Sequence, residues 1–380
     1  MYEDFVYFVR DLYGTNDLIP LHAPQFQGNE KQYLLETIDS TFVSSVGKFV
    51  DRFEQSVAEY TGAKHAIATV NGTAALHIAL KLAGVEPECE VITQSLTFVA
   101  TCNAIRYCQA KPVFVDVDKT TIGLSATSVE AFLQEYSEIR DDGSCWNRKS
   151  RRRIVACLPM HTFGFPVELD SIKRICDQYN IALVEDAAES LGSRYKDKHT
   201  GIISKTAAIS FNGNKIITTG GGGAILTNDS ELANRAKHIT TTAKIPHRWD
   251  FVHDEIGYNY RLPNINAALG VAQMEVLPKY LKSKREIAHA YQQWGRDRGV
   301  EFFNESESTT ANYWLNTMIA ENRHQRDEIL KQTNAMNVMT RPAWRPMHLL
   351  EINQDCQATK LTNTEFLFDR LVSVPSSVKL

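Results

Sequence analysis

The sequence predicts an α/β protein in which helices cover both faces of a mostly parallel β-sheet. Between residues 65 and 227, short apolar runs of strand length alternate with longer runs that have helical periodicity. This alternation is typical of parallel strands joined by helical crossovers. The chain has 380 residues, enough for about two domains. Because the alternation weakens further on, we expect a large domain over residues 1–255 and a smaller C-terminal α+β domain over residues 256–380.

The expected elements can be given in chain order. Helices precede the alternating region at 2–12, 30–39 and 48–60. The predicted strands are 65–70, 90–93, 112–117, 153–158, 181–185, 207–211 and 224–227. The predicted helices are 73–83, 98–107, 128–139, 170–179, 229–240 and 264–298, and a weaker mixture follows at 313–320, 323–335 and 365–371. We expect Pro278 to break the longest helix, because proline removes one helical hydrogen bond and crowds the preceding turn.

The composition excludes several classes of protein. A net charge of −4 argues against a nucleic-acid surface or a polybasic membrane patch. No apolar run approaches the ~20 residues that a bilayer requires, and the acidic N-terminus is unlike a signal peptide. The seven cysteines are scattered and have no C-x-x-C spacing, so we interpret them as reduced core thiols rather than disulfides or metal ligands. We therefore expect a cytoplasmic protein without a metal site.

A basic loop, DDGSCWNRKSRRR at 141–153, separates one predicted helix from the following strand. We interpret it as a solvated excursion, and the alternative is that its cluster of arginines contacts a phosphate.

Lys215 lies in a turn between two predicted strands, and Thr218, Thr219 and the four glycines Gly220–Gly223 follow it. The glycines permit positive φ angles and close approach of the backbone without steric cost. A lysine here is either a solvated charge or an amine aimed into a pocket. In the second case a fixed and partly desolvated amine can form a Schiff base. The residues at other strand ends favour the second interpretation.

In sheets of this kind, ligands bind beyond the carboxyl ends of the strands. After the first predicted strand, Gly72, Thr73 and Ala74 begin a helix whose free N–H groups and threonine hydroxyl form a possible phosphate cradle. Alternatively, Thr73 or Asn71 is only a helix cap. At the next such turn, Phe98 either stacks on a planar ring or belongs to the core.

The predicted apolar strand that begins at Ile181 ends in two acids, Glu185 and Asp186. An acid in this position is costly to bury without a cationic partner, and a protonated pyridine nitrogen would be one. The alternative is that Asp186 caps a helix. Glu189 would lie on the same side, and Ser210 precedes Lys215 by a short turn. A lysine, an acid, an aromatic ring and a phosphate cradle together make up a pyridoxal-phosphate site.

These motifs resemble those of the DegT-type nucleotide-sugar aminotransferases, a branch of the fold-type-I, aspartate-aminotransferase-like pyridoxal-phosphate enzymes. The matching blocks, which run in the family's order from about residue 20 onward, are NGTAALHIAL, LTFVATCNAI, VFVDVD, EDAAES, SFNGNKIITTGGGGAI and GYNYRLPNINAALG. The resemblance implies a large domain with a seven-stranded, mostly parallel sheet. SSVGKFVDRFE, FNGNK and RPAWRPMH are most similar to the aminotransferases of legionaminic-acid and bacillosamine synthesis, which act on a UDP-linked 4-keto-6-deoxy-N-acetylhexosamine.

The resemblance also implies roles for individual residues. Lys215 would hold pyridoxal 5′-phosphate through a Schiff base and then move a proton between Cα of the amino donor and C4′ of the cofactor. Asp186 would pair with the ring nitrogen, Phe98 would stack on the ring, and Glu189 would lie near the phenolic oxygen. The residues that would hold the phosphate are Gly72, Thr73, Ala74 and Ser210.

The same resemblance implies a homodimer with shared active sites. Asn259, in YNYR, would reach the phosphate of the neighbouring subunit, with Arg261 as a companion. We expect the substrate-side residues to be His161, Trp344, Arg345 and His348, and a purely structural role is as good an interpretation of each histidine.

Two positions depart from the family's pattern. Relatives often carry an acid among the glycines after the lysine, where this chain has Gly221. Phe165, in HTFGFP, stands where many relatives have a polar residue, which alters either sugar recognition or packing.

The expected function is transfer of an amino group from glutamate to C4 of a nucleotide-linked 4-keto-6-deoxy sugar, with 2-oxoglutarate as the second product. The expected sugar is UDP-4-keto-6-deoxy-N-acetylglucosamine, in bacterial surface-glycan or nonulosonic-acid synthesis. One alternative is a pyridoxal-phosphate-dependent sugar dehydratase, although relatives with that chemistry carry histidine in place of the lysine. The other alternative is a regulatory protein that has kept the fold and lost catalysis.

Overall fold

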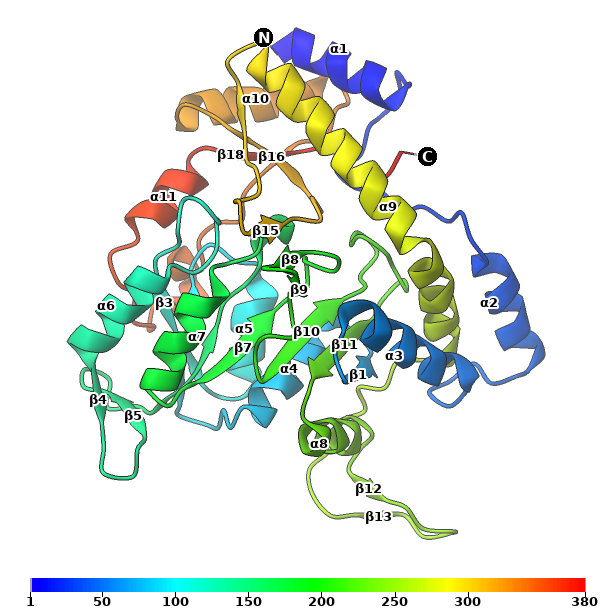
Figure 1. The fold of residues 1–380 in the computed structure, drawn as a ribbon, viewed down its shortest axis with the longest axis vertical. Coiled ribbons are helices and arrows are strands. Elements are labelled where there is room, and N and C mark those ends of the chain that lie inside the picture. The colour runs from blue at the N-terminus through cyan, green and yellow to red at the C-terminus, as the bar shows by residue number, and fades with distance from the viewer. Residues whose placement is uncertain (1, 380) are drawn as a thin grey trace.

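A seven-stranded sheet forms the centre of the computed structural model, which describes residues 2–379 (Figure 1). From one edge to the other its strands are β1 (His65–Thr69), β11 (Gly223–Thr227), β10 (Thr206–Ser210), β7 (Ala182–Asp186), β6 (Ile154–Leu158), β2 (Glu90–Gln94) and β3 (Lys111–Val115). Strand β11 runs antiparallel to β1 and β10, and the other neighbours are parallel. The expected mostly parallel, seven-stranded sheet is confirmed.

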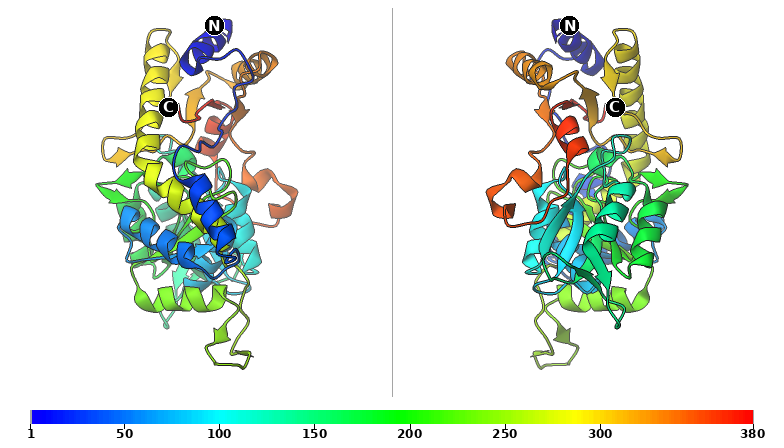
Figure 2. Two further views of the ribbon diagram at one scale, coloured as in Figure 1. Left: turned by 90° about the vertical axis from the view of Figure 1, so that its right-hand side faces the viewer. Right: turned by 90° about the vertical axis from the view of Figure 1, so that its left-hand side faces the viewer.

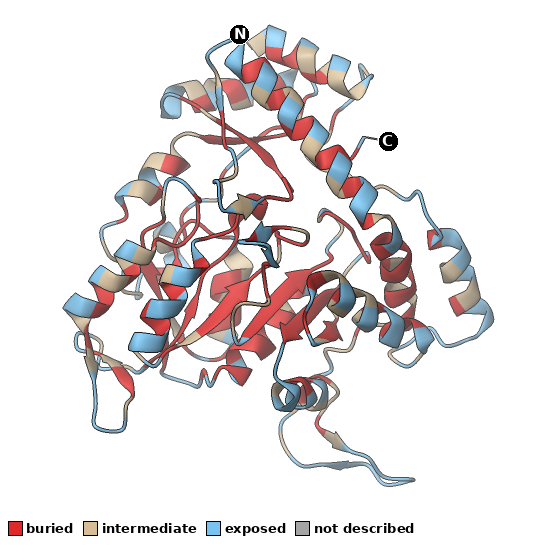
Figure 3. Ribbon diagram, viewed as in Figure 1, coloured by how far each residue is buried: buried red, intermediate tan, exposed pale blue. Residues whose placement is uncertain are grey.

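Helices cover both faces of this sheet, because successive strand residues point to opposite sides. Ile225 packs with α4 on one face, and its neighbour Leu226 packs with α3 and α9 on the other. The first face carries α4 (Gly72–Leu82), α5 (Val99–Tyr107) and α8 (Ser230–Thr240). The second carries α3 (Lys48–Thr61), α6 (Ala126–Tyr136), α7 (Leu169–Gln178) and α9 (Asn264–Arg296). The strands are accordingly buried throughout the sheet (Figure 3).

A second, antiparallel sheet lies at the other end of the molecule (Figure 2). Its strands, in order, are β14 (Glu301–Phe302), β16 (Asn316–Ile319), β18 (Leu371–Val374) and β17 (Arg341–Pro342). The helices near it are α10 (Arg323–Ala335), α11 (Thr362–Phe368) and α1 (Tyr2–Tyr13). Helix α1 packs on the C-terminal half of α9, where the rings of Phe5 and Trp294 lie 5.1 Å apart. The division at residue 255 stays a prediction, and α1 contacts elements that follow it.

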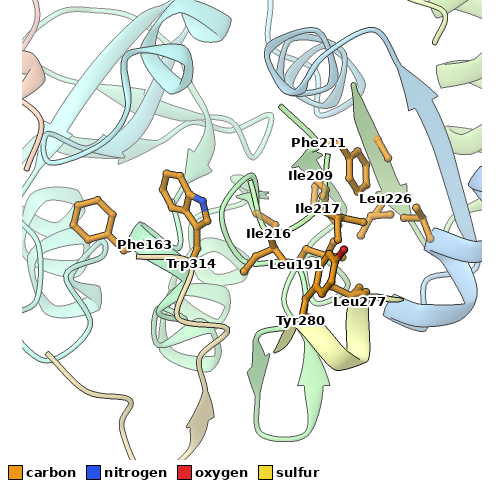
Figure 4. Packing of buried hydrophobic residues seen from close by; sticks show 14 of the residues in the cluster. Phe163, Leu191, Ile209, Phe211, Ile216, Ile217, Leu226, Leu277, Tyr280 and Trp314 are labelled. Carbon is orange, nitrogen blue, oxygen red and sulfur yellow. The ribbon is translucent and has the colours of Figure 1, made fainter. Parts of the chain in front are cut away.

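The expected break of the longest helix at Pro278 is wrong. Helix α9 continues through the proline for 33 residues. Its first half packs on α3 and α2 (Glu30–Asp39), and its second half packs on α1 and β14. Leu277 and Tyr280, on either side of the proline, are buried in the core (Figure 4). The burial on both sides outweighs the single missing hydrogen bond, which costs about 3 kcal/mol in an isolated helix.

The helix expected over 128–139 is also too long. Helix α6 ends at Tyr136, and residues 137–139 form β4 (Ser137–Ile139), which pairs with β5 (Cys145–Asn147). The basic loop therefore contains one strand of a hairpin, because Trp146 and Cys145 give β4 cross-strand partners.

Several very short elements escape prediction, because two or three residues are too few to show a period. They are β8 (Arg194–Tyr195), β9 (Lys198–His199), β15 (Thr309–Thr310), the hairpin β12 (Lys244–Ile245) and β13 (Val252–His253), and the 3₁₀ turns η1 (Thr162–Gly164), η2 (Met347–Leu349) and η3 (Glu351–Asn353). The β12–β13 hairpin projects from the body of the molecule (Figure 1). Within residues 2–379, no helix is long and apolar enough to span a membrane.

The glycine run after Lys215 supports the start of α4. Of its four glycines, only Gly220 has a positive φ, at 80°. Gly223 begins β11, and a Cβ there would lie 2.5 Å from the carbonyl oxygen of Asn71 and 2.7 Å from the nitrogen of Gly72. Only glycine therefore allows β11 to pass directly against the backbone that begins α4.

We predict that Gly223→Ala destabilises the protein by about 1–3 kcal/mol, because the new methyl group must push the α4 start away from the sheet. Gly221→Ala is the matched control: its Cβ would meet nothing closer than the Val70 oxygen at 3.8 Å, so stability should change little. Urea unfolding of both variants at one protein concentration measures the difference. Equal stability of the two variants would contradict the role given to Gly223.

Candidate active site

A cavity of about 350 Å³ lies at the carboxyl ends of β7 and β10, beside the start of α4. It brings together most of the residues that the sequence singles out. Its lining consists of Asn71, Gly72, Thr73, Leu76, Phe98, Ala100, Met160, Asp186, Ala188, Glu189, Ser210, Asn212, Asn214, Lys215, Trp314 and Trp344. The Lys215 cavity, as we call it, is therefore built from segments that are far apart in the chain and that the parallel sheet gathers at one edge.

Lys215 is held in place by the core on one side and by polar contacts on the other. Ile216 and Ile217, which follow it directly, are buried against α9 (Figure 4). Its side chain is only 12% exposed, and Nζ lies 3.0 Å from Glu189 Oε1. The same nitrogen lies 3.9 Å from the centre of the Trp314 ring. Lys215 is thus a fixed and partly desolvated amine, as Schiff-base chemistry requires.

Asp186 is a buried acid without a cation to pair with. Its Oδ2 accepts a hydrogen bond from Thr101 Oγ1 at 2.7 Å, and its Oδ1 accepts one from the Ala188 nitrogen at 3.2 Å. Burial raises the pKa of Asp186 above its usual value, although the hydrogen bond from Thr101 opposes the rise. Among the ion pairs of residues 2–379 none includes Asp186, so a cationic ring nitrogen in the cavity would supply the missing charge.

Glu189 links the lysine to the 3₁₀ turn η1. While Oε1 faces Lys215, Oε2 accepts a hydrogen bond from the Phe163 nitrogen at 2.9 Å. Burial raises the pKa of Glu189 to about 7, and the charge of Lys215 opposes that rise. Phe163 itself has a positive φ of 56°, which is unusual for a bulky residue and typical of functional sites. The glutamate therefore holds both the amine of Lys215 and the backbone of Phe163.

The start of α4 forms the expected cradle. Asn71 is its N-cap and accepts a hydrogen bond from the Ala74 nitrogen at 2.8 Å, so Thr73 is not the cap. A Cβ at Gly72 would lie 2.8 Å from Ser210 Cβ, so glycine lets the helix start approach the end of β10. The N–H groups of Gly72 and Thr73 and the hydroxyls of Thr73 and Ser210 can hold a phosphate.

The structure does not support Ala74 as a cofactor contact. Its N–H group already donates to the Asn71 cap, and Ala74 is buried outside the cavity lining.

Two aromatic residues stand over the cavity. Phe98 precedes α5 and is 45% exposed, so it is not the core residue of the alternative interpretation. Its ring lies 6.0 Å from that of Trp344, which the sequence places among the substrate-side residues. Both line the cavity, and a planar ring there would have an aromatic face to stack on.

The two candidate histidines lie outside the cavity lining. His161 is fully buried: its Nδ1 accepts from the Val167 nitrogen at 3.2 Å, and its Nε2 lies 3.0 Å from Glu185 Oε2. A substrate cannot reach it, so the structural interpretation replaces the substrate-side one. His348 Nδ1 forms a hydrogen bond of 2.7 Å with Ser95 Oγ, and burial lowers the pKa of His348. Its contact with Ser95 ties η2 to the end of β2.

Asn259 and Arg261 also lie outside the lining of this chain's own cavity. Asn259 is exposed and accepts a hydrogen bond from Arg261 Nε at 3.1 Å. Arg345 is exposed and lines a neighbouring cavity instead. Phe165 is buried against Phe303 and Tyr313, with ring centres 4.7 and 5.5 Å away, so its departure from the family's pattern affects packing.

Several contributors to the cavity were missed, and Thr101 and Trp314 are two of them. The sequence indicates Thr101 only weakly as a site residue, because its hydroxyl lies in the first turn of α5, close after Phe98. The sequence does not indicate Trp314 as a site residue, because it lies 99 positions beyond Lys215, in the segment before β16. Its Nε1 donates to the Asn214 oxygen at 2.6 Å, which holds the indole under the lysine turn.

The chain matches known proteins over nearly its whole length. The model of the DegT/DnrJ/EryC1/StrS aminotransferase family matches residues 24–380. GDP-perosamine synthase of Caulobacter vibrioides is 37% identical over 87% of this chain and 86% of its own, and the putative pyridoxal phosphate-dependent aminotransferase EpsN of Bacillus subtilis is 36% identical over 94% and 90%. A solved DegT DnrJ EryC1 StrS aminotransferase from Brucella abortus superposes with a TM-score of 0.82 at 27% identity, over 92% of this chain and 90% of its own.

Another solved structure, DesI in the presence of its TDP-sugar product, superposes with a TM-score of 0.83 at 26% identity, over 95% of this chain and 88% of its own. Helicobacter pylori PseC, at 23% identity and a TM-score of 0.85 over 94% of both chains, supports the fold.

We predict that Glu189 makes the stability of the cofactor-free protein depend on pH. Because its pKa is raised from 4.5 to about 7 in the folded state, the stabilisation by its proton is complete below pH 4.5 and is lost as the pH rises through about 7. The free energy of unfolding should therefore fall by about 3 kcal/mol relative to Glu189→Gln, which does not titrate. Urea unfolding of both proteins between these limits measures the difference, and parallel curves would contradict the buried acid.

Proposed function

The chain belongs to the DegT/DnrJ/EryC1/StrS aminotransferase family, and within it we propose that the protein transfers an amino group from glutamate to C4 of a nucleotide-linked 4-keto-6-deoxy sugar. The observation that carries this proposal is the Lys215 cavity, where a desolvated amine, a buried unpaired acid and a helix start lie together. Lys215 is present where the dehydratases carry histidine, which argues against the dehydratase alternative. The chain belongs to an aminotransferase family, which argues against the regulatory alternative.

Pyridoxal 5′-phosphate is the cofactor, and when bound it supplies an aldehyde that reacts with amines and a ring that accepts electrons. The residues of the cavity fit this group. Lys215 would hold its aldehyde carbon, Asp186 its ring nitrogen, and Phe98 one face of the ring. Thr73 and Ser210, with the start of α4, would hold its phosphate.

Within that arrangement the chain's own groups hold and move protons. The core fixes the position of Lys215, and Glu189 is the hydrogen-bond partner of its Nζ. Lys215 Nζ can therefore carry a proton between two atoms that it faces. Glu189 Oε1 lies 3.0 Å away and can take up a proton from the amine near neutral pH. Asp186, as a buried anion, favours a protonated ring nitrogen and so keeps the ring an electron acceptor.

For the nucleotide, two observations favour different candidates. The blocks SSVGKFVDRFE, FNGNK and RPAWRPMH favour UDP-4-keto-6-deoxy-N-acetylglucosamine, with UDP-4-amino-4,6-dideoxy-N-acetylglucosamine as product, in bacterial surface-glycan or nonulosonic-acid synthesis. The relatives that are named GDP-perosamine synthase, at 33–37% identity, favour a GDP-linked sugar as the second candidate.

A homodimer with shared sites is part of the proposal. Asn259 lies outside the lining of its own chain's cavity. The segment before it, which contains the β12–β13 hairpin, exposes large apolar side chains: Trp249 is 69% exposed, Phe251 79% and Ile256 82%. Exposed apolar surface of this kind is typical of a face that another chain covers. If a second copy covers this segment, Asn259 lies at the subunit interface, as the proposed contact with the neighbour's phosphate requires.

We predict that Lys215→Ala lowers the rate of amino transfer at least a thousandfold, because the transferable amine is lost. Lys215→Arg is the matched control: it keeps the charge beside Glu189 but should be equally inactive. The measurement is NMR identification of products from glutamate and a panel of UDP- and GDP-linked 4-keto sugars. Full turnover by Lys215→Ala would refute the assignment, and the nucleotide of the converted sugar decides between the two candidates.

A second prediction concerns the dimer. Lys215→Ala and Asn259→Ala should each be poorly active, while a refolded equal mixture should regain about a quarter of wild-type activity, since half of the dimers then contain one complete site. Activity that stays at the level of the separate variants would place Asn259 outside the neighbour's site. Sedimentation of each variant checks that both still associate.

A further inference from the structure

A second cavity, of about 690 Å³, adjoins the Lys215 cavity. The two cavities share a wall made of three residues, Asn214, Trp314 and Trp344. Trp314 and Phe163 are seen together in Figure 4. Phe163 lines the second cavity, and its backbone nitrogen donates to Glu189, so the carboxylate that faces Lys215 also holds a residue of the second cavity. We call this second space the donor cavity.

The charges of the two cavities differ. The lining of the Lys215 cavity contains two acids, Asp186 and Glu189, and one cation, Lys215. The lining of the donor cavity contains two cations, Arg341 and Arg345, and no acid. A dicarboxylate placed wholly in the first cavity would therefore meet two buried acids and a single cation, and its carboxylates are better matched by the second.

His22 is the residue that points to a ligand. Both of its ring nitrogens are buried, and neither has a hydrogen-bond partner among the described residues. Burial lowers the pKa of His22 well below its usual value, and nearby positive charges, that of Lys215 among them, lower it further. A buried ring nitrogen without a partner is costly, and it indicates that a group is missing from the cavity that His22 lines.

Arg345 supplies the charge. It is exposed, and within residues 2–379 it forms no hydrogen bond or ion pair that would occupy its guanidinium. Arg341 lines the same cavity, but it donates to Asn334 Oδ1 at 2.9 Å and to the Thr340 oxygen at 2.8 Å. Of the two arginines, only Arg345 has its five donors free for an anion.

We propose that Arg345 and His22 bind a carboxylate of the amino donor, a dicarboxylic amino acid whose amine faces Lys215 across the shared wall. This inference rests on the proposed function, which supplies glutamate as the donor. Because the linings of the two cavities share Asn214, Trp314 and Trp344, an amino acid bound at this boundary would contact both. The diphosphate of a nucleotide sugar is carried on C1, across the ring from the C4 that must face Lys215, and so fits the adjoining space less well.

The test measures binding and reaction separately. Glutarate, which has both carboxylates but no amine, is titrated into the cofactor-loaded protein by calorimetry, and bleaching of the cofactor absorbance by glutamate is followed without any sugar. Arg345→Gln should weaken glutarate binding and raise the glutamate concentration for half-maximal bleaching roughly 10- to 100-fold, the range for a lost charge-assisted hydrogen bond. The glutarate affinity of Arg345→Lys should lie between those of wild type and Arg345→Gln. His22→Phe should give a smaller weakening, about threefold to tenfold.

Arg341→Gln is the matched control, because it removes the same charge from the same cavity while its donors serve Asn334 and Thr340. It should leave glutarate binding within about twofold of wild type. The cofactor's own affinity, from absorbance titration, should be unchanged in Arg345→Gln. The proposal is overturned if wild type does not bind glutarate, if Arg345→Gln binds it normally, or if Arg345→Gln weakens UDP or GDP binding instead.

Failure of this inference is distinguishable from failure of the proposed function. If glutarate binding depends on Arg345 but no 4-keto sugar is converted, the sugar assignment fails and the donor site stands. If sugars are aminated and Arg345 makes no difference to glutamate, only the donor site fails.

Discussion

The active site depends on two carboxylates that are buried with too little positive charge around them. Asp186 and Glu189 lie at the ends of the central strands, where water is excluded, and Lys215 is the one cation that lines their cavity. Such an arrangement is costly in the cofactor-free chain, as the raised pKa values of both acids show. The cost is offset when a cationic ring nitrogen enters beside Asp186, so the shortage of positive charge favours binding of the cofactor ring. The tight packing of Gly72 on Ser210 and of Gly223 on the α4 start keeps the other half of the site rigid.

The sequence predicts the sheet well because both faces of its strands are buried. The apolar runs around Ile67, Ile92 and Val184 indicate both a strand and its burial, so the alternation of strands with helices can be predicted from the sequence. Asp186, Ser210 and the start of α4 lie at or close after strand ends, and Lys215 follows Ser210 by one turn. A parallel sheet places such strand ends close together, whatever the side-chain contacts are. For that reason Lys215, Asp186, Gly72 and Ser210 could be chosen from spacing and residue type.

What could not be predicted depends on contacts between distant segments. His161 lies in a motif beside the site, yet its imidazole contacts Glu185 and lies outside the cavity lining. Trp314 reaches the lysine from a segment without periodicity, and its role exists only because the antiparallel sheet folds back over the central one. Pro278 shows the same limit for secondary structure, since tertiary packing of α9 on both its halves overrides a local preference.

Helix α9 has a consequence for how the two sheets respond to each other. Its first half belongs to the core that holds Lys215, through Ile217 and Leu277, and its second half belongs to the core around Trp294. One rod is thus embedded in both cores, so neither can open or melt without losing packing in the other. Trp314 and Trp344, which follow α9 in the chain, therefore reach the Lys215 cavity from a part of the protein that this helix joins to the central sheet. We expect the molecule to unfold as one cooperative unit rather than to open as two lobes on a hinge.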